Sequence, residues 1–287
     1  MRAVDRWRIA SVTKAFVSTV VLQLEAERKL DIDDSVDRWL PGVVPNGGAI
    51  TLRELMNHTS GIYNYTDDST FVNALLSNPG RVWTPRELVA VGIAHPPLFP
   101  PGTNFSYSNT NYILLGLVVE AVTGASLGDE LQQRIFTPLG LTATSFPSAI
   151  GLAAPDFVHG YFTPTRIDIT SLLGPSAGWA AGAIVSNARD VTTFYRALLG
   201  GRLLPATQLA ELKTPSTVAG TYGLGIDNAT IVCGRAVGHN GDFFGWRTEV
   251  LATANGKRQA VVMVNVDDSF VPWARLQADV RLALCRG

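Results

Sequence analysis

Excess charge, long apolar runs and cysteine are all scarce in this chain of 287 residues. The net charge is −1, so composition gives no electrostatic reason to expect a nucleic acid or an anionic membrane as partner. The best apolar runs, residues 15–22 and 113–119, are too short to cross a bilayer and are better interpreted as core helices. Cys233 and Cys285 are most simply interpreted as buried thiols, and a disulfide between them stays open.

Lysine is also scarce, and one of the four lysines lies in a motif that can carry chemistry. Ser11-Val-Thr-Lys14 opens an apolar helical pattern and puts a weak nucleophile one turn before a proton acceptor. At the three other lysines the residue three positions earlier is alanine. The alternative is a serine that caps a helix beside a solvated lysine.

The remaining composition is that of a globular protein, with 46% apolar and 16% charged residues. The length allows one large domain or two interleaved ones. The periodicity predicts helices in the middle of the chain, and Thr51 and Thr84 each begin a capping box. Strands are expected near the C-terminus and a final helix after Pro272. The predicted helices cover residues 14–30, 111–123, 126–136 and 187–199, and the predicted strands residues 231–239, 243–254 and 257–266, with a tight hairpin at 255–256.

Two other sites compete for the nucleophile. Gly124-Ala-Ser126-Leu-Gly128 has the spacing of a nucleophile elbow, but a helix and not a strand precedes it, so we expect Ser126 to cap a helix. A histidine-dependent triad is the other alternative, although sequence gives no histidine a spatial partner. The four histidines are His58, His95, His159 and His239.

Two further segments carry polar residues at element boundaries. Tyr107-Ser-Asn109 lies in a loop just before a helix, where a tyrosine can shuttle protons if a nearby cation lowers its pKa. The amide of Asn109 can position a carbonyl or the lysine. His239-Asn240-Gly241 ends a predicted strand, and Gly241 allows close approach of a substrate backbone. Alone, each segment is equally well an ordinary turn or helix entry.

Taken together, the three motifs in this order resemble the active-site elements of the serine β-lactamase and penicillin-binding protein superfamily. The resemblance is closest to secreted DD-carboxypeptidases and class C β-lactamase-like hydrolases, and further matching segments extend it over nearly the whole chain. It implies an α+β fold in which an antiparallel sheet with flanking helices meets a mainly helical domain at the active site. Residues 1–45 and 190–287 would form the sheet domain and residues 46–189 the helical domain.

The resemblance also implies a mechanism without metal or cofactor. Ser11 would form an acyl-enzyme, and Lys14 with Tyr107 would take its proton and return it to the leaving group. The backbone N–H groups of Ser11 and Asp242 would form the oxyanion hole. Asn109 and the 239–242 segment (His239, Asn240, Gly241, Asp242) would position the substrate, a small molecule or short peptide such as a peptidoglycan stem peptide.

The same family places a disulfide near the C-terminus, which implies a Cys233–Cys285 bridge and a secreted or extracytoplasmic location. Residues 1–10 contain no signal peptide. The family's usual first helix and strands are also missing, so we expect either a start further upstream or a truncated version of the domain.

The sequence departs from the carboxypeptidase pattern at the residues that are expected to bind the substrate. Asn240 and Asp242 replace hydroxyl residues, and Asp227 lies where an arginine is expected, so a substrate carboxylate would be repelled unless Arg247 compensates. This favours D-amino-acid peptides or amides and small esters over free carboxylates and β-lactams. The alternative is a non-enzymatic homologue that binds peptides or a partner in the same cleft.

Overall fold

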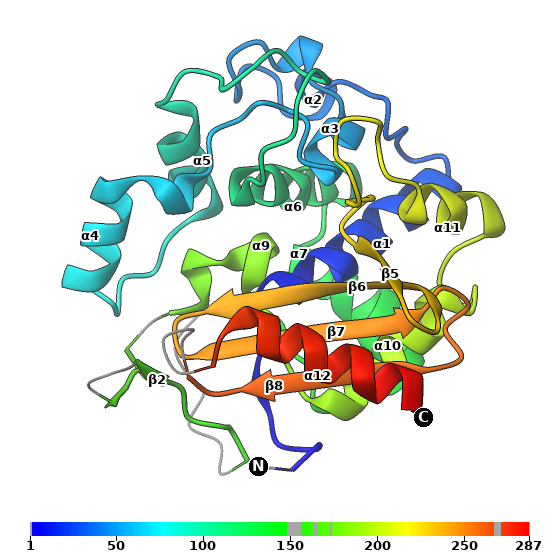
Figure 1. Cartoon of the computed structure of the whole chain (residues 1–287). Coiled ribbons are helices and arrows are strands. Elements are labelled where there is room, and N and C mark those ends of the chain that lie inside the picture. The colour runs from blue at the N-terminus through cyan, green and yellow to red at the C-terminus, as the bar shows by residue number, and fades with distance from the viewer. Residues whose placement is uncertain (1, 148–155, 163–165, 173, 267–270, 287) are drawn as a thin grey trace.

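The largest sheet has four antiparallel strands in the order β5-β6-β7-β8. The computed structural model describes residues 2–147, 156–162, 166–172, 174–266 and 271–286. Helix α12 (Trp273–Arg286) crosses one face of the sheet, and α1 (Thr13–Ala26) and α10 (Ala188–Leu199) lie behind the other (Figure 1). The predicted α+β fold with helices flanking an antiparallel sheet is therefore confirmed. The strands are β5 (Asp227–Ile231), β6 (Gly234–Phe243), β7 (Trp246–Thr253) and β8 (Gln259–Val264).

The strand boundaries differ from those predicted. The first expected strand, residues 231–239, spans a turn: β5 ends at Ile231 and β6 begins at Gly234. Val232 is fully exposed at this turn, so an apolar residue that suggested a buried strand lies in solvent. The predicted hairpin exists between β7 and β8, but five residues connect the strands instead of two.

Helix α1 is the centre of the molecule. Eleven of its fourteen residues are buried, so it is apolar on nearly every side and not along one stripe. Phe16 stacks on Phe194 of α10 with ring centroids 3.6 Å apart. Helix α6 (Asn109–Thr123) is buried to a similar degree. Two buried helices thus hold the two segments that carry Ser11 and Asn109.

The predicted helix caps are confirmed, although α1 ends at Ala26, before the predicted end at residue 30. Thr51 and Thr84 both form complete capping boxes at α3 (Leu52–Met56) and α5 (Pro85–Ile93). Ser126 accepts the backbone N–H of Asp129 and caps α7 (Leu127–Leu131), as expected for a structural serine. Gly124 ends α6 in the left-handed conformation, so a helix does precede Ser126.

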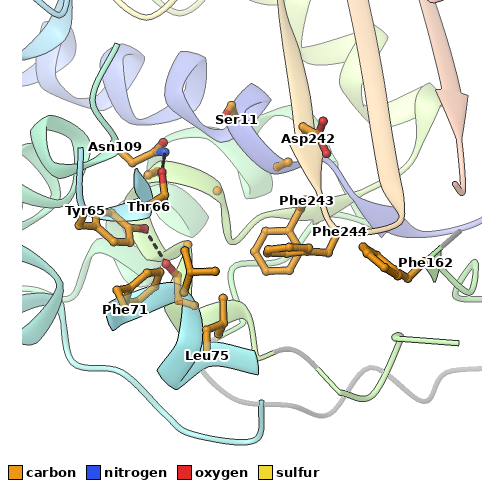
Figure 2. Close-up of a pocket in the computed structure, with 16 residues that line it drawn as sticks. Ser11, Tyr65, Thr66, Phe71, Leu75, Asn109, Phe162, Asp242, Phe243 and Phe244 are labelled. Carbon is orange, nitrogen blue, oxygen red and sulfur yellow. Dashed lines mark hydrogen bonds between the residues drawn. The ribbon is translucent and has the colours of Figure 1, made fainter. Parts of the chain in front are cut away.

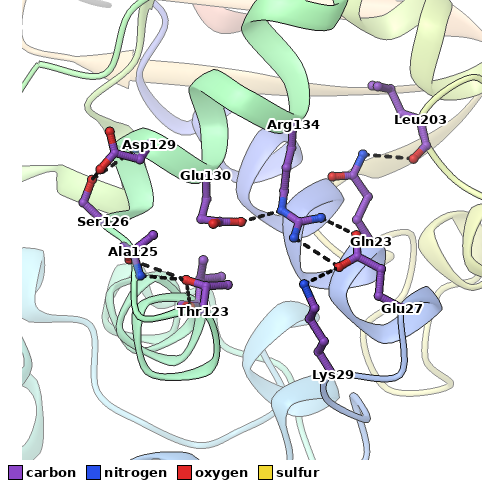
Figure 3. A network of polar contacts seen from close by, with 11 residues as sticks. Gln23, Glu27, Lys29, Thr123, Ala125, Ser126, Asp129, Glu130, Arg134 and Leu203 are labelled. Carbon is purple, nitrogen blue, oxygen red and sulfur yellow. Dashed lines mark hydrogen bonds and ion pairs between the residues drawn. The ribbon is translucent and has the colours of Figure 1, made fainter.

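An ion-pair network fixes the far end of α1. The Arg134 guanidinium donates to the carboxylates of Glu130 and Glu27, and Lys29 lies 2.9 Å from Glu27 (Figure 3). The hydrogen bond between the Gln23 amide and the Leu203 carbonyl, 3.0 Å long, continues it. These contacts join the C-terminal turn of α1 to the segment after α7.

The remaining elements are short. Two small antiparallel pairs, β1 with β4 and β2 with β3, lie outside the main sheet. No single helix among the described residues is long and apolar enough to cross a membrane. The other elements are β1 (Trp7–Arg8), η1 (Ala10–Val12), α2 (Val36–Trp39), η2 (Gly47–Ala49), η3 (Tyr65–Asp67), α4 (Ser69–Ser77), η4 (Gln132–Phe136), α8 (Thr137–Leu139), β2 (Tyr161–Phe162), β3 (Ile167–Asp168), η5 (Pro175–Ala177), α9 (Trp179–Gly182), β4 (Val185–Ser186) and α11 (Ala206–Lys213).

A disulfide joins Cys233 to Cys285, as the family resemblance implied. Cys233 lies in the turn between β5 and β6 rather than at the start of a strand, and Cys285 lies in the last turn of α12. The bridge therefore ties the end of the covering helix to the edge of the sheet.

Candidate active site

The turn that carries Ser11 leads directly into α1. Ser11 lies in the short 3-10 turn η1, and Lys14 follows in the first turn of α1. Lys14 is fully buried, and its Nζ lies 3.0 Å from the Ser11 hydroxyl oxygen. The preceding residue, Ala10, has φ of +48°, which is rare for a residue with a side chain. Such local strain is typical of backbone that holds a functional group in place.

Two acceptors surround the lysine amine besides the serine. Lys14 Nζ donates to Asn109 Oδ1 and to the Ala181 carbonyl, both at 2.8 Å. Both oxygens can only accept, so they use the two hydrogens of a neutral amine and leave its lone pair for the Ser11 hydroxyl. Burial lowers the pKa of Lys14 well below its ordinary value, which favours this neutral form.

Asn109 is held in the orientation that this requires. Its Nδ2 donates to Thr66 Oγ1 at 3.1 Å, so its Oδ1 faces Lys14. Its backbone N–H donates to Asn64 Oδ1 at 2.9 Å, at the start of α6. No local sequence pattern pointed to Thr66 or Asn64, because both lie at η3, about 45 residues earlier in the chain than Asn109.

Tyr107 lies over the same group. The Lys14 Nζ is 4.9 Å from the centroid of the Tyr107 ring, and the Tyr107 hydroxyl hydrogen-bonds with Ser11. Burial raises the pKa of Tyr107, and the Ser11 contact opposes this only in part. The condition for a resting phenolate, a pKa lowered by a nearby cation, is therefore not met, and with a raised pKa we expect Tyr107 to relay a proton as a neutral phenol.

Histidines occupy other positions. The hydroxyl of Ser11 contacts Lys14 and Tyr107 rather than a histidine in the described part of the chain. His95 pairs with Asp68, and His159 pairs with Asp168, both through carboxylate contacts outside this group. A histidine triad around Ser11 is thus not the arrangement found.

His58 and His239 lie near Tyr107 but face other partners. The ring of His58 packs 4.3 Å from that of Tyr107, and its Nδ1 accepts the N–H of Ser108. His239 contacts the Tyr222 hydroxyl at 2.8 Å. Burial lowers the pKa of His239 to about 3, with the nearby Lys14 as the second cause.

Strand β6 brings the third predicted motif against the serine turn. A Cβ added at Gly241 would lie 2.2 Å from the carbonyl oxygen of Ile9, so only glycine allows this approach. Asn240 and Asp242 on either side are exposed. The structure thus brings Gly241 and Asp242 to the beginning of α1, whereas Asn240 lines a separate hollow with Glu249 and Arg281.

A cavity of about 320 Å³ opens beside Ser11. Its wall is mostly apolar, with Phe71 and Leu75 from α4 facing Phe243 and Phe244 at the end of β6 (Figure 2). Among the described residues that line it, Asp242 has the only side chain with a formal charge. Among the described residues, no group of three or more histidine, cysteine or acidic side chains could hold a metal ion.

Arg247 does not face this cavity. It is completely buried on β7 opposite Asp242, with its Nε 3.8 Å from the Asp242 carboxylate. Its guanidinium also lies over the Trp273 ring, 3.9 Å from the centroid. Arg247 therefore contacts its neighbours in the fold and is not exposed for a substrate carboxylate.

Comparison with known proteins agrees with this geometry. The beta-lactamase family matches residues 1–284. The chain belongs to the beta-lactamase family. Two curated relatives of this beta-lactamase-family chain, both from Bacillus subtilis, carry the name penicillin-binding protein. The chain spans about half to three fifths of the length of the first curated relatives that it matches.

Two solved structures and one curated relative of this beta-lactamase-family protein have names that refer to D-stereospecific or D-amino-acid hydrolysis. A D-stereospecific amidohydrolase from Streptomyces sp. is 41% identical, has a TM-score of 0.87, and the match covers 92% of this chain and 83% of that one. D-amino acid amidase from Ochrobactrum anthropi, in complex with L-phenylalanine amide, is 26% identical with a TM-score of 0.86, over 100% and 85% of the two chains. The D-aminopeptidase of Brucella anthropi is 28% identical over 270 residues, which are 91% of this chain and 50% of that protein.

Proposed function

We propose that this protein hydrolyses amides of D-amino acids that have a large apolar side chain and a free amine, through an acyl-enzyme on Ser11. The observation that carries the proposal is the cavity beside Ser11, which has apolar walls, one carboxylate and no lysine or arginine among its described lining residues. A substrate with a free carboxylate would find no lysine or arginine among the described lining residues, whereas an ammonium group can reach Asp242, whose side chain is half exposed beside the buried Arg247. The names of the similar structures support the same substrate class.

In the proposed reaction, Lys14 accepts the Ser11 proton as the hydroxyl attacks the amide carbonyl. A C–O bond forms, and the carbonyl π electrons move to the oxygen, which the N–H groups of Ser11 and Asp242 stabilise. Tyr107 donates a proton to the leaving ammonia as the C–N bond breaks, and is reprotonated from Lys14. Water then attacks the ester through the same groups and releases the D-amino acid.

The aromatic wall is proposed to select the side chain. Phe71, Leu75, Phe243 and Phe244 can surround an aromatic ring, and burial of such a ring contributes on the order of 2 kcal/mol. We expect D-phenylalanine amide to have a lower KM than D-alanine amide. Phe244→Ala should reduce this difference and leave turnover of D-alanine amide nearly unchanged.

A substrate panel tests the proposed function. The panel compares D-phenylalanine amide, L-phenylalanine amide, D-alanyl-D-alanine and a cephalosporin, with Ser11→Ala as control. We expect the D-amide to be the best substrate and the free-carboxylate dipeptide the poorest. Rapid hydrolysis of the dipeptide, or equal rates with Ser11→Ala, would overturn the proposal. Saturable binding without turnover would instead favour a non-enzymatic binding protein.

The disulfide supports a location for this activity. Disulfides persist in oxidising compartments, and the Cys233–Cys285 bridge is closed in the structure. We infer that the enzyme works outside the cytoplasm, where short D-amino-acid compounds from peptidoglycan would be available.

A further inference from the structure

The two nitrogens of the His239 ring both have partners, although His239 belongs to the third active-site motif. Its Nε2 lies 2.8 Å from the Tyr222 hydroxyl, and its Nδ1 lies 2.5 Å from the carbonyl oxygen of Asn240. A carbonyl can only accept, so Nδ1 carries the ring hydrogen. A neutral ring then has an unprotonated Nε2, which must accept the hydroxyl hydrogen of Tyr222. The contacts alone thus define one tautomer.

The surrounding rings and the turn before β5 hold Tyr222 in place beside Nε2 of His239. It lies in the turn before β5, with its ring 4.9 Å from His58 and 6.2 Å from Tyr107. In the same turn Gly225 has φ of +82°, and a Cβ there would lie 2.2 Å from Ser18 Oγ. The hydroxyl therefore has little freedom to leave His239.

The neighbouring hydroxyls leave the Tyr222 proton for His239. Tyr112 donates its own hydrogen to the Met56 carbonyl at 2.9 Å, and Ser18 lies 3.0 Å from the Tyr112 oxygen. Tyr112 can therefore accept a hydrogen from Ser18, and it does not need one from Tyr222.

The Asn240 carbonyl lies on the part of β6 that matters for catalysis. Strand β5 pairs with β6 only from Gly234 to Gly238, so β5 does not pair with the last part of β6, residues 239–243. In a strand, the backbone groups of residues two apart point to the same edge. The carbonyl of Asn240 and the N–H of Asp242, the proposed oxyanion donor, therefore share one edge.

We propose that Tyr222 is a positioning residue: it donates its hydroxyl hydrogen to Nε2 of the Nδ1–H tautomer of His239 and anchors the ring, so that the ring holds the Asn240 carbonyl and keeps the Asp242 N–H directed at the Ser11 cavity. His239 then takes no proton from substrate or nucleophile. This inference rests on the proposed acyl-enzyme mechanism, and it adds to it a residue that touches neither substrate nor Ser11. Loss of the restraint weakens transition-state binding more than ground-state binding.

The tautomer can be measured without any turnover. Protein labelled with ¹⁵N-histidine is studied by long-range ¹H–¹⁵N NMR at neutral pH, with His239→Gln to assign the signals. We expect a protonated Nδ1 and an unprotonated Nε2 for His239 in the wild type, and a shifted Nε2 signal in Tyr222→Phe, where the hydrogen bond to Nε2 is lost. A protonated Nε2 in the wild type, or unchanged His239 signals in Tyr222→Phe, would overturn the proposal.

Kinetics give the second readout. Tyr222→Phe should lower kcat for D-phenylalanine amide by about tenfold to a hundredfold, less than or similar to the loss of a whole oxyanion donor, with KM changed by less than about twofold. Tyr195→Phe, which removes a buried hydroxyl on α10 remote from the site, is the matched control and should keep full activity. Unchanged kcat in Tyr222→Phe contradicts the inference. A wild type inactive on every amide and ester contradicts the proposed function instead, while the NMR result still decides the tautomer.

Discussion

The amine of Lys14 lies 3.0 Å from the hydroxyl oxygen of Ser11, one helical turn away, inside a fully buried environment. This pair defines the proposed chemistry. Burial lowers the pKa of Lys14 and raises the pKa of Tyr107, so we propose Lys14 as the base and Tyr107 as the proton relay.

The pH dependence of acylation should follow Lys14. The neutral amine is the active form, so kcat/KM should rise as pH increases through the lowered pKa of Lys14 and then level off. Lys14→Met should lower kcat about 10²–10⁴-fold and remove this rise. Initial rates with D-phenylalanine amide between pH 5 and 11 test this. A rate that increases only near pH 10.5, the ordinary lysine pKa, would contradict a neutral resting amine.

Gly241 should tolerate no side chain. A Cβ there would meet the Ile9 carbonyl at 2.2 Å, so Gly241→Ala must push β6 away from the serine turn. We expect kcat to fall more than tenfold and the free energy of unfolding to fall by about 1–3 kcal/mol. Gly80→Ala is the control, because nothing lies within 4 Å of its added Cβ. Rates and urea midpoints of the two variants decide the matter, and equal activity in both would show that the close approach is not needed.

Local signals predicted the helix ends well. Thr51, Thr84 and Gly124 each act through neighbours three or four residues away, so their caps can be inferred from a short window of sequence. The turn at Val232 was missed because its apolar side chain is exposed, against the usual burial of such residues. The division into a sheet domain and a helical domain stays a prediction.

The residues of the three site motifs could be inferred from the sequence, but the residues that orient them through hydrogen bonds could not. Thr66 orients Asn109, and Tyr222 contacts His239, through hydrogen bonds between distant parts of the chain. Tyr222 lies in one of the further segments that extend the family resemblance, and that resemblance implied no role for it. Only the fold shows that its hydroxyl meets the histidine.

The disulfide should stabilise the sheet side of the molecule. It closes a loop of 52 residues between the β5–β6 turn and α12, and bridges of this kind contribute about 2–4 kcal/mol. Replacing both Cys233 and Cys285 by serine should lower the urea midpoint accordingly. Activity at low temperature should persist, because neither cysteine lines the cavity. Identical unfolding curves for wild type and variant would contradict this.

Glu249 should make stability depend on pH. Burial raises the pKa of this carboxyl to about 7 in the folded protein, against 4.5 as its ordinary value. A raised folded pKa means that the folded state keeps a proton that the unfolded chain has lost. Stability from this group therefore falls as pH rises from about 4.5 to 7, by up to about 3 kcal/mol. Glu249→Gln should flatten this part of the curve. Urea unfolding at pH 5 and pH 8 tests it, and an equal pH effect in both proteins would exclude Glu249 as the cause.

The most direct test of the central claim is intact-mass and peptide mass spectrometry after exposure to the p-nitrophenyl ester of D-phenylalanine, with acid quenching. A serine acyl hydrolase should show one added D-phenylalanyl group on the peptide that contains Ser11, and Ser11→Ala should show none. A folded wild-type protein without an adduct, or with the adduct on another residue, would contradict the account.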